Sequence, residues 1–434
     1  RGIPGGEDIA FMDALLDSSI EFVVTRHEQG AAFMADVYGR LTGKAGVCMS
    51  TLGPGATNLV TGVADGNMDR APMVAIAGQG ATTRMHKESH QILDLVNLFE
   101  PITKYSTQIR APEIVPEVVR KAFKFAQAEK PGAAFIDFPE NIADMDVGSL
   151  VPLKVQSASA PNAARGKCRQ VAEMITKANN PIIIAGNGII RHGASDALIE
   201  FAESINAPVA TTFMAKGVIP SSHHLSLGTV GLKAHDLVAF GIDDADLVIC
   251  VGYDMVEYDP AHWNPNYDKK IIHVDGSPAE VDSHYIVEAG VIGDLKDSMA
   301  RIGAQCDREP SPAMKSLRKK ISHELNRHAE DVSYPVKPQK IIYDIRQCLE
   351  PEDVVISDVG AHKMWMARMF QAERPNTCII SNGFASMGIA LPGAIAAKLV
   401  YPERNVLAVT GDGGFMMNNQ EVETAVRLGL NITI

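Results

Sequence analysis

Short apolar runs alternate with helix-like segments along the N-terminal third of the chain. The runs that read as strands are Phe22–Val24, Val47–Ser50, Met73–Ala77 and Ala134–Asp137. A helix-like segment at residues 8–16 precedes the first run, and a second one, the small and apolar stretch Glu28–Arg40, follows it. Strands that alternate with helices in this way predict a parallel sheet covered by helices on both faces.

The same alternation continues twice more after a segment rich in Ser, Ala and Pro at residues 151–165, which reads as a linker. Later strands are expected at Pro181–Gly186, Val209–Thr211, Leu247–Gly252, Ile271–Asp275, Val354–Ser357, Cys378–Ile380 and Val406–Thr410, with a charged helix near 314–330. The fold class predicted is therefore α/β, with three doubly wound parallel-sheet domains in series. We expect their boundaries at residues 1–150, 166–310 and 335–434.

Composition narrows the class of protein. Of the 434 residues, 46% are hydrophobic and 21% are charged, as in an ordinary globular protein. The net charge of −12 argues against nucleic acid or an anionic membrane as a partner, because binding to phosphates needs a basic surface. Six scattered cysteines without a CxxC pair favour a reducing, cytoplasmic setting. The first residue is Arg1 and the last ones form an apolar run, so we expect folded structure to continue beyond both ends.

The stretch from Val406 to the C-terminus has the pattern strand, glycine turn, helix. Gly411-Asp412-Gly413-Gly414 forms the turn, and Asn418 with Glu421 predicts a helix cap. The glycines would let a diphosphate approach the backbone, and the Asp412 carboxylate would hold a hard divalent cation such as Mg²⁺. Taken alone, a tight turn that happens to contain an aspartate explains the pattern equally well.

Glu28 is the sharpest single candidate for chemistry. It follows a predicted strand and lies in the first turn of a helix, within Thr25–Gly30. A carboxylate there could simply stabilise the helix by interacting with its dipole, which is worth about 0.3–1 kcal/mol. The wider sequence around Glu28 favours a catalytic role.

Several motifs resemble those of thiamine diphosphate enzymes. GDG followed after roughly 25–30 residues by Asn is their metal–diphosphate motif, although that Asn would lie beyond Ile434. RHEQGAAFMADVYGRLTG and TLGPGATNLVTGVADGNMDRAPMVAI resemble the pyrimidine-binding domain of acetolactate synthases. The resemblance continues at MHKESHQ, KPG, NPI, DLVICVGY and SNG, and so covers nearly the whole chain.

This resemblance implies a role for each candidate site residue. Glu28 would hydrogen-bond N1′ of the aminopyrimidine, and Gln91 would face the reacting carbon. Among the cofactor-binding residues, Gly5 and Gly6 would form a closing loop, and Pro54, Gly55 and Asn58 would lie beside the pyrimidine. Ala385 would contact the pyrimidine through its carbonyl, and Met387 would be the wedge that bends the cofactor. The residues expected at the diphosphate are Val359, Gly360, Ala361, His362, Gly411, Gly413 and Gly414. Asp412 would bind the metal. Met387 could instead be a core methionine, and His362 a structural histidine.

The resemblance also implies an activity and an assembly. The expected reaction joins two pyruvates into 2-acetolactate and CO₂ on thiamine diphosphate and Mg²⁺, in a homodimer or homotetramer with active sites between subunits. The segment Gly252–Asn264 resembles the FAD-independent, catabolic type, and Gly186-Asn187-Gly188 is only a GxG, so FAD is not expected. The alternatives are an FAD-containing biosynthetic acetohydroxyacid synthase, a glyoxylate- or sulfoacetaldehyde-handling relative, and a non-catalytic binding protein of the same fold.

Overall fold

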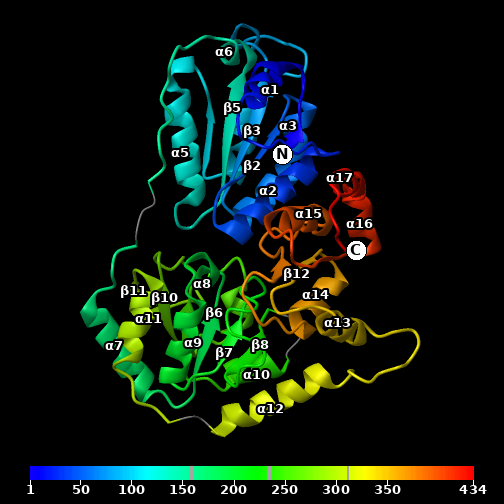
Figure 1. The fold of residues 1–434 in the computed structure, drawn as a ribbon. Coiled ribbons are helices and arrows are strands. Elements are labelled where there is room, and N and C mark those ends of the chain that lie inside the picture. The colour runs from blue at the N-terminus through cyan, green and yellow to red at the C-terminus, as the bar shows by residue number, and fades with distance from the viewer. Residues whose placement is uncertain (157–159, 232–235, 310–311) are drawn as a thin grey trace. The chain divides into compact units, whose positions relative to one another are not determined.

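The computed structural model describes residues 1–156, 160–231, 236–309 and 312–434 (Figure 1). Its contacts divide the chain into two compact units. The first unit comprises Arg1–Ala158, Ile356–Val359 and Gly383–Ile434, and the second comprises Ser159–Val355 and Gly360–Asn382. Three parallel-sheet α/β layers occur in series along the chain, which confirms the predicted fold class.

The described elements alternate between strands and helices as the sequence pattern predicts. The strands are β1 (Gly2–Ile3), β2 (Gly46–Ser50), β3 (Met73–Gln79), β4 (Tyr105–Gln108), β5 (Ala133–Pro139), β6 (Pro181–Ala185), β7 (Val209–Thr211), β8 (Ser226–Thr229), β9 (Leu247–Val251), β10 (Lys270–Asp275), β11 (Val287–Ile292), β12 (Val354–Ser357), β13 (Cys378–Ile380) and β14 (Val406–Val409). The helices are α1 (Ile9–Leu16), α2 (Glu28–Thr42), α3 (Pro54–Met68), α4 (Leu95–Phe99), α5 (Val115–Gln127), α6 (Glu140–Ala143), α7 (Arg165–Lys177), α8 (Gly188–Arg191), α9 (Ser195–Ser204), α10 (Leu237–Asp243), α11 (Leu295–Gly303), α12 (Pro312–Asn326), α13 (Pro338–Gln347), α14 (Ala361–Met369), α15 (Ala390–Val400), α16 (Asp412–Asn418) and α17 (Glu421–Arg427).

The first sheet has the order β1-β2-β3-β5-β4, and its strands pair in parallel. Strand β4 was not predicted from the sequence, and two further details differ from the expectation. The strand expected at Phe22–Val24 is reduced to one bridge between Val24 and Gly2. The edge strand is instead Gly2–Ile3, because Gly2 packs so closely on β2 that a Cβ there would lie 1.9 Å from the carbonyl oxygen of Met49.

Helices α2 and α3 lie against each other in the first unit, and small residues make their close contact possible. A Cβ at Gly62 of α3 would lie 2.5 Å from the Cβ of Ala32 on α2. Ala31, Ala32 and Leu59 are fully buried between these helices and the sheet. Helix α2 follows the segment that contains Val24, and α3 follows β2. Because both helices start after these segments end, their packing brings their N-terminal turns together.

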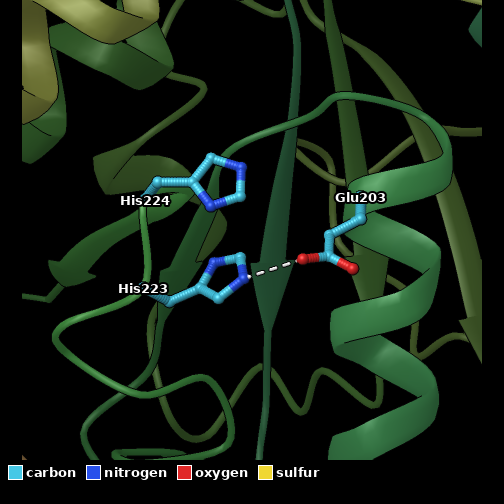
Figure 2. A group of neighbouring side chains, drawn as sticks. All are labelled: Glu203, His223 and His224. Atoms are coloured by element: carbon cyan, nitrogen blue, oxygen red, sulfur yellow. Dashed lines mark hydrogen bonds and ion pairs between the residues drawn. The ribbon is translucent and has the colours of Figure 1, made fainter.

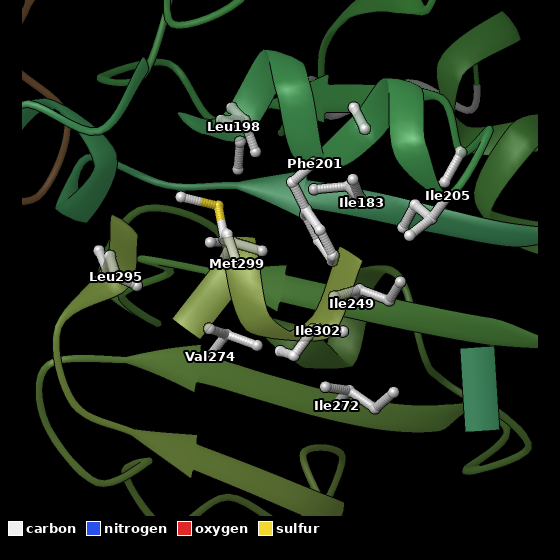
Figure 3. Close-up of a cluster of buried hydrophobic side chains, with 14 of the residues drawn as sticks. Ile183, Leu198, Phe201, Ile205, Ile249, Ile272, Val274, Leu295, Met299 and Ile302 are labelled. Carbon is white, nitrogen blue, oxygen red and sulfur yellow. The ribbon is translucent and has the colours of Figure 1, made fainter. Parts of the chain in front are cut away.

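The second unit holds a six-stranded parallel sheet of order β11-β10-β9-β6-β7-β8. Figure 3 shows the core between this sheet and helices α9 and α11. Leu198, Phe201 and Ile205 follow the helical spacing on and just after α9 and are at most 2% exposed. Strands β8 and β11 were not anticipated from the sequence, since Ser226–Thr229 and Val287–Ile292 are polar or only partly buried.

The chain order reverses between β6 and β9, which makes their carboxyl ends the switch point where open α/β sheets often bind ligands. Here the backbone itself fills that position. The N–H of Gly188 donates to the carbonyl of Gly252 across 2.8 Å, and a Cβ at Gly186 would lie 2.4 Å from the same oxygen.

The third sheet has the order β13-β12-β14. Its strands Val354–Ser357 and Cys378–Ile380 match the predicted ranges, and β14 ends at Val409, one residue before the predicted end. Among the described residues, no helix is long and apolar enough to cross a membrane.

Candidate active site

Glu28 is the first residue of α2, and its side chain is buried. His27 caps this helix by accepting the Gln29 N–H at Nδ1 across 3.1 Å. Glu28 is 7% exposed, and the residues Ala31–Met34 that follow it are fully buried. The Asn58 side-chain amide donates to Oε2 of Glu28 across 2.9 Å. The structure therefore brings two predicted site residues, Glu28 and Asn58, into direct contact.

Three more predicted residues lie in or against the N-terminal turn of α3. A Cβ at Gly55 would lie 3.3 Å from Oε1 of Glu28. Gly53 has φ +52°, and its missing side chain leaves room for the backbone of Gln91, which has φ +58°. The loop that carries Gln91 thus lies on the turn that opens with Pro54.

The N-terminal glycine loop also lies on this turn. A Cβ at Gly5 would lie 2.3 Å from Oγ1 of Thr51, and Glu7 accepts a hydrogen bond from the same hydroxyl across 3.1 Å. Apart from its own chain neighbours, none of the described residues comes within 4 Å of the Cβ position of Gly6. Asp8 holds the loop by accepting the Gly5 N–H, and burial raises the pKa of its carboxyl to about 7.

The glycine turn after β14 differs in one respect from the sequence expectation. Helix α16 begins at Asp412 itself, so Gly413 and Gly414 lie within the helix and not before it. Asp412 is exposed, and its Oδ1 accepts the Gly413 N–H across 2.9 Å. A carboxylate at this place is available to a cation from solvent.

Met387 lies next to this turn. Its methyl carbon is 3.2 Å from the Cβ position of Gly413, and its side chain is only half-buried. A position at the edge of a turn does not fit the interpretation of Met387 as a core methionine. Ala385, two residues earlier, has φ +57°, a left-handed conformation that is unusual for alanine.

The helix cap predicted from Asn418 and Glu421 is wrong. Asn418 is the last residue of α16 and donates to the carbonyl of Gly388 across 2.8 Å. Glu421 is buried, and its Oε1 accepts the backbone N–H groups of Arg26 and His27, each across 2.9 Å. Burial raises the pKa of Glu421. Both side chains make tertiary contacts that local sequence rules do not register.

The loop that contains Ala385 is held by two buried carboxylates that the sequence reasoning missed. The Gly383 N–H donates to Asp69, and the Ser386 N–H donates to Asp65 across 3.2 Å. The Arg40 guanidinium lies between them, with distances of 2.8 Å to Asp69 and 3.1 Å to Asp65. A clue was present in the sequence, because Asp65 lies within a helix of mostly small residues and Asp69 directly follows its last residue.

Asp36 completes this buried cluster, which we call the Arg40 cluster (Arg40, Asp36, Asp65 and Asp69). The Arg40 guanidinium bonds Asp36 one helical turn earlier, at 2.6 Å. All three carboxylates are fully buried. Burial, together with the neighbouring carboxylates, raises the pKa of Asp65 well above its usual range.

Of the Val359–His362 loop, Val359 is in the first unit and the other three residues are in the second. Gly360 caps α14 with φ 152°, and Ala361 and His362 form its first turn. His362 is half-buried beside Gly360, where a Cβ would lie 3.0 Å from its ring. The structure thus places these residues at a helix N-terminus, which is a favourable position for an anion.

Away from these loops, Glu203, His223 and His224 form a group whose ligand atoms lie within 4.8 Å of one another (Figure 2). His223 Nε2 is 3.1 Å from Oε1 of Glu203, while its Nδ1 accepts the Leu225 N–H across 3.2 Å. A ring that accepts at Nδ1 carries its proton on Nε2 and donates it to the carboxylate. Metal-bound histidines instead donate their second nitrogen, so this group is a hydrogen-bonded pair and not an open ligand set.

Comparison with known proteins gives matches along most of the chain. The family model described as "Thiamine pyrophosphate enzyme, N-terminal TPP binding domain" matches residues 1–98, the central domain of the same enzymes matches 168–302, and their C-terminal TPP binding domain matches 358–434. Thiamine pyrophosphate is another name for thiamine diphosphate.

Curated relatives are similar over the whole chain. A protein named "Probable acetolactate synthase large subunit" from Methanocaldococcus jannaschii is 36% identical over 100% of this chain and 76% of its own length. "Acetolactate synthase" from Bacillus subtilis is 37% identical over 98% and 76%. "Acetolactate synthase, catabolic" from Raoultella terrigena is 35% identical over 99% and 78%.

Proposed function

Because the chain belongs to the acetolactate synthase-like thiamine diphosphate enzymes, we propose that it joins two pyruvates into 2-acetolactate and CO₂. The observation that carries this proposal is the buried Glu28 carboxylate, hydrogen-bonded by Asn58, at the start of a helix in the segment that matches the N-terminal cofactor-binding domain.

Thiamine diphosphate, when bound, supplies the carbon nucleophile that attacks a 2-keto acid and accepts the electrons left when CO₂ departs. Glu28 would hold a proton at N1′ of its aminopyrimidine. The low polarity around Ala31–Met34 strengthens that hydrogen bond. Asn58 keeps the carboxylate oriented through Oε2, and Oε1 lies toward Gly55.

The residues near Asp412 fit a diphosphate and a hard cation. Mg²⁺ is usually bound through one or two carboxylates together with phosphate oxygens and waters, and Asp412 offers an exposed carboxylate. Gly411 and Gly413 keep the backbone beside it accessible. Gly414 has a different reason to be glycine, since a side chain there would meet Asp358.

The second unit supports the proposal that FAD is not a cofactor. The buried Glu257 carboxylate accepts the Asn187 N–H across 2.9 Å, at the turn after β6. This N–H is the donor that a dinucleotide phosphate would use in a sheet of this kind. The turn also packs on Gly252, so its donor is occupied from within the protein.

A flavin spectrum tests this part of the proposal. We expect the purified protein to be colourless and to need no added FAD. Stoichiometric flavin that survives gel filtration would contradict the catabolic, FAD-independent type and favour the biosynthetic acetohydroxyacid synthases.

We further propose a homodimer or homotetramer with its active sites between subunits, in a reducing cytoplasm. Helices α16 and α17 expose apolar side chains, among them Met416 at 66% and Val426 at 73%. An apolar face next to a predicted cofactor site is suited to a second copy of the chain. The six cysteines are free thiols, as a reducing setting requires.

The proposed reaction is tested by supplying pyruvate, thiamine diphosphate and Mg²⁺ and measuring acetolactate and CO₂. We expect one CO₂ released for each acetolactate formed. Glyoxylate and sulfoacetaldehyde serve as competing substrates. Preferential turnover of either would overturn the pyruvate assignment, and no turnover of any 2-keto acid would favour a binding role.

A further inference from the structure

A second carboxylate, Asp358, organises the cofactor side of the first unit. It follows β12 directly and is 1% exposed. Its own N–H donates to the carbonyl of Val409 at the end of β14, across 2.8 Å. The side chain therefore starts from the point where two neighbouring parallel strands end.

Both oxygens of the Asp358 carboxylate are used, and each joins two different segments. Oδ1 accepts the N–H groups of Val359 at 2.7 Å and Gly388 at 2.8 Å. Oδ2 accepts the N–H of Ala390 at 3.2 Å, and the Thr410 hydroxyl lies 3.4 Å from it, with its single proton shared with the Gly411 carbonyl at 3.0 Å. Three backbone donors and this shared hydroxyl therefore surround the carboxylate.

These donors come from the three segments that carry the predicted cofactor contacts on this side. Val359 begins the loop expected at the diphosphate. Gly388 follows Met387 directly. Thr410 precedes the Gly411–Gly414 turn. One buried side chain thus fixes the relative positions of three loops that are distant in the sequence.

Gly414 shows how closely the turn approaches this carboxylate. A Cβ at Gly414 would lie 2.9 Å from both Cγ and Oδ1 of Asp358, nearer than real Cβ atoms come to other atoms. The backbone at Gly414 is helical, so alanine would be favourable there if Asp358 were absent. The last glycine of the turn is therefore explained by Asp358.

We propose that Asp358 is a positioning residue, which assembles the Val359, Met387 and Asp412 loops into one surface for the diphosphate half of thiamine diphosphate. This inference rests on the proposed function. Asp358 acts through its neighbours, and the property it controls is the affinity for the cofactor.

The chemistry of the side chain makes Asp358→Asn a sharp test. Asparagine has the same shape but replaces one acceptor oxygen with an NH₂ donor. That donor would face either the N–H groups of Val359 and Gly388 or the N–H of Ala390, so at least one hydrogen bond is replaced by a repulsive contact between two donors.

Asp353→Asn is the matched control. Asp353 lies at the opposite end of the same strand, is 4% exposed and accepts the Glu350 N–H across 2.8 Å. It resembles Asp358 in burial and in bonding to backbone, but the N–H that it accepts comes from the turn before β12 and not from one of the three loops. Both variants should lower the melting temperature.

The measurement is calorimetric titration of the whole protein with thiamine diphosphate in saturating Mg²⁺. We expect Asp358→Asn to weaken the binding of thiamine diphosphate by about 10–100-fold. This is the loss typical of replacing a residue that positions the binding groups without touching the bound species itself. The dissociation constant of Asp353→Asn should equal that of the unmodified protein. Equal affinities in all three proteins would overturn the inference.

Gly414→Ala provides a second route should Asp358→Asn not fold. Alanine suits the helix, so the added methyl perturbs mainly the contact with Asp358, and we expect weaker cofactor binding here too. Unchanged binding in Gly414→Ala would count against Asp358. Binding without acetolactate formation would overturn the proposed reaction alone, and no binding by the unmodified protein would overturn both.

Discussion

The side-chain amide of Asn58 lies 2.9 Å from Oε2 of Glu28 and donates a hydrogen bond to it. The bond joins the first turn of α2 to the second turn of α3. Because the carboxylate is buried, its orientation is set by this contact and by the packing of Gly55. The two helices thus present one defined carboxylate oxygen beside the α3 turn.

In Asn58→Ala the loss of kcat, expressed as a free energy of activation, should exceed the loss of unfolding free energy. A hydrogen bond to a charged group is worth about 1.5–3 kcal/mol, and its loss would cost about tenfold or more in rate if Glu28 must be aligned for reaction. Steady-state kinetics and a thermal melt measure the two effects. Asn97→Ala, an exposed asparagine on α4, is the control. A kcat equal to that of the control would mean that Asn58 does not orient Glu28.

The Arg40 cluster predicts a large effect on stability. Arg40→Leu would remove the guanidinium that bonds Asp36, Asp65 and Asp69, and breaking a buried ion pair in this way costs about 3–5 kcal/mol. Urea unfolding measures the change. Arg110→Leu, at an exposed position, should change the free energy of unfolding little. Similar losses of unfolding free energy in Arg40→Leu and Arg110→Leu would show that the Arg40 cluster stabilises the fold no more than an exposed arginine does.

The sequence predicted those elements that are determined by a few consecutive residues. Glu28 opens a helix, and Asn58 lies in the second turn of a helix that follows a glycine turn; both patterns are visible in a few consecutive residues. Strands β12 and β13 were predicted with correct bounds because they are fully buried apolar runs. The sequence also placed Gly5, Gly55 and Gln91 in one site, and the structure shows that they gather on the turn before α3.

Features that depend on distant residues were not predictable in the same way. In the sequence, Asp358 resembles any aspartate that follows a strand. Its role becomes visible only when the fold brings Gly388 and Thr410 next to it. Glu421 looked like part of a helix cap, yet it bonds the backbone at Arg26 and His27, nearly four hundred residues away in the chain. Short strands such as β4 and β8 carry polar side chains, so their pairing partners define them and not their own composition.

Glu257 should make the stability of the protein depend on pH. Burial raises the pKa of this carboxyl from 4.5 to about 7, against the opposing effect of the hydrogen bonds from Thr212 and Asn187. Between these two pH values the folded chain holds a proton that the unfolded chain has lost. The contribution is therefore full below pH 4.5 and is lost as the pH rises through about 7.

Glu257→Gln isolates this effect from other titrating groups. Glutamine keeps an acceptor for the Asn187 N–H, and the Thr212 hydroxyl can turn to accept from the new amide. We expect the unfolding free energy of the unmodified protein to fall, relative to the variant, by on the order of a few kcal/mol between about pH 4.5 and 7. Parallel pH profiles for the two proteins would contradict the assignment.

The central claim is that Glu28 controls the proton at N1′ of thiamine diphosphate. Hydrogen–deuterium exchange at C2 of the bound cofactor, followed by NMR after acid quench, tests it most directly. Glu28→Gln preserves shape and the contact with Asn58 but cannot move a proton, so exchange should slow by about 10²–10⁴-fold while the fold persists. Glu21→Gln, an exposed glutamate before the same helix, should exchange normally. Exchange in Glu28→Gln as fast as in the unmodified protein would contradict the account.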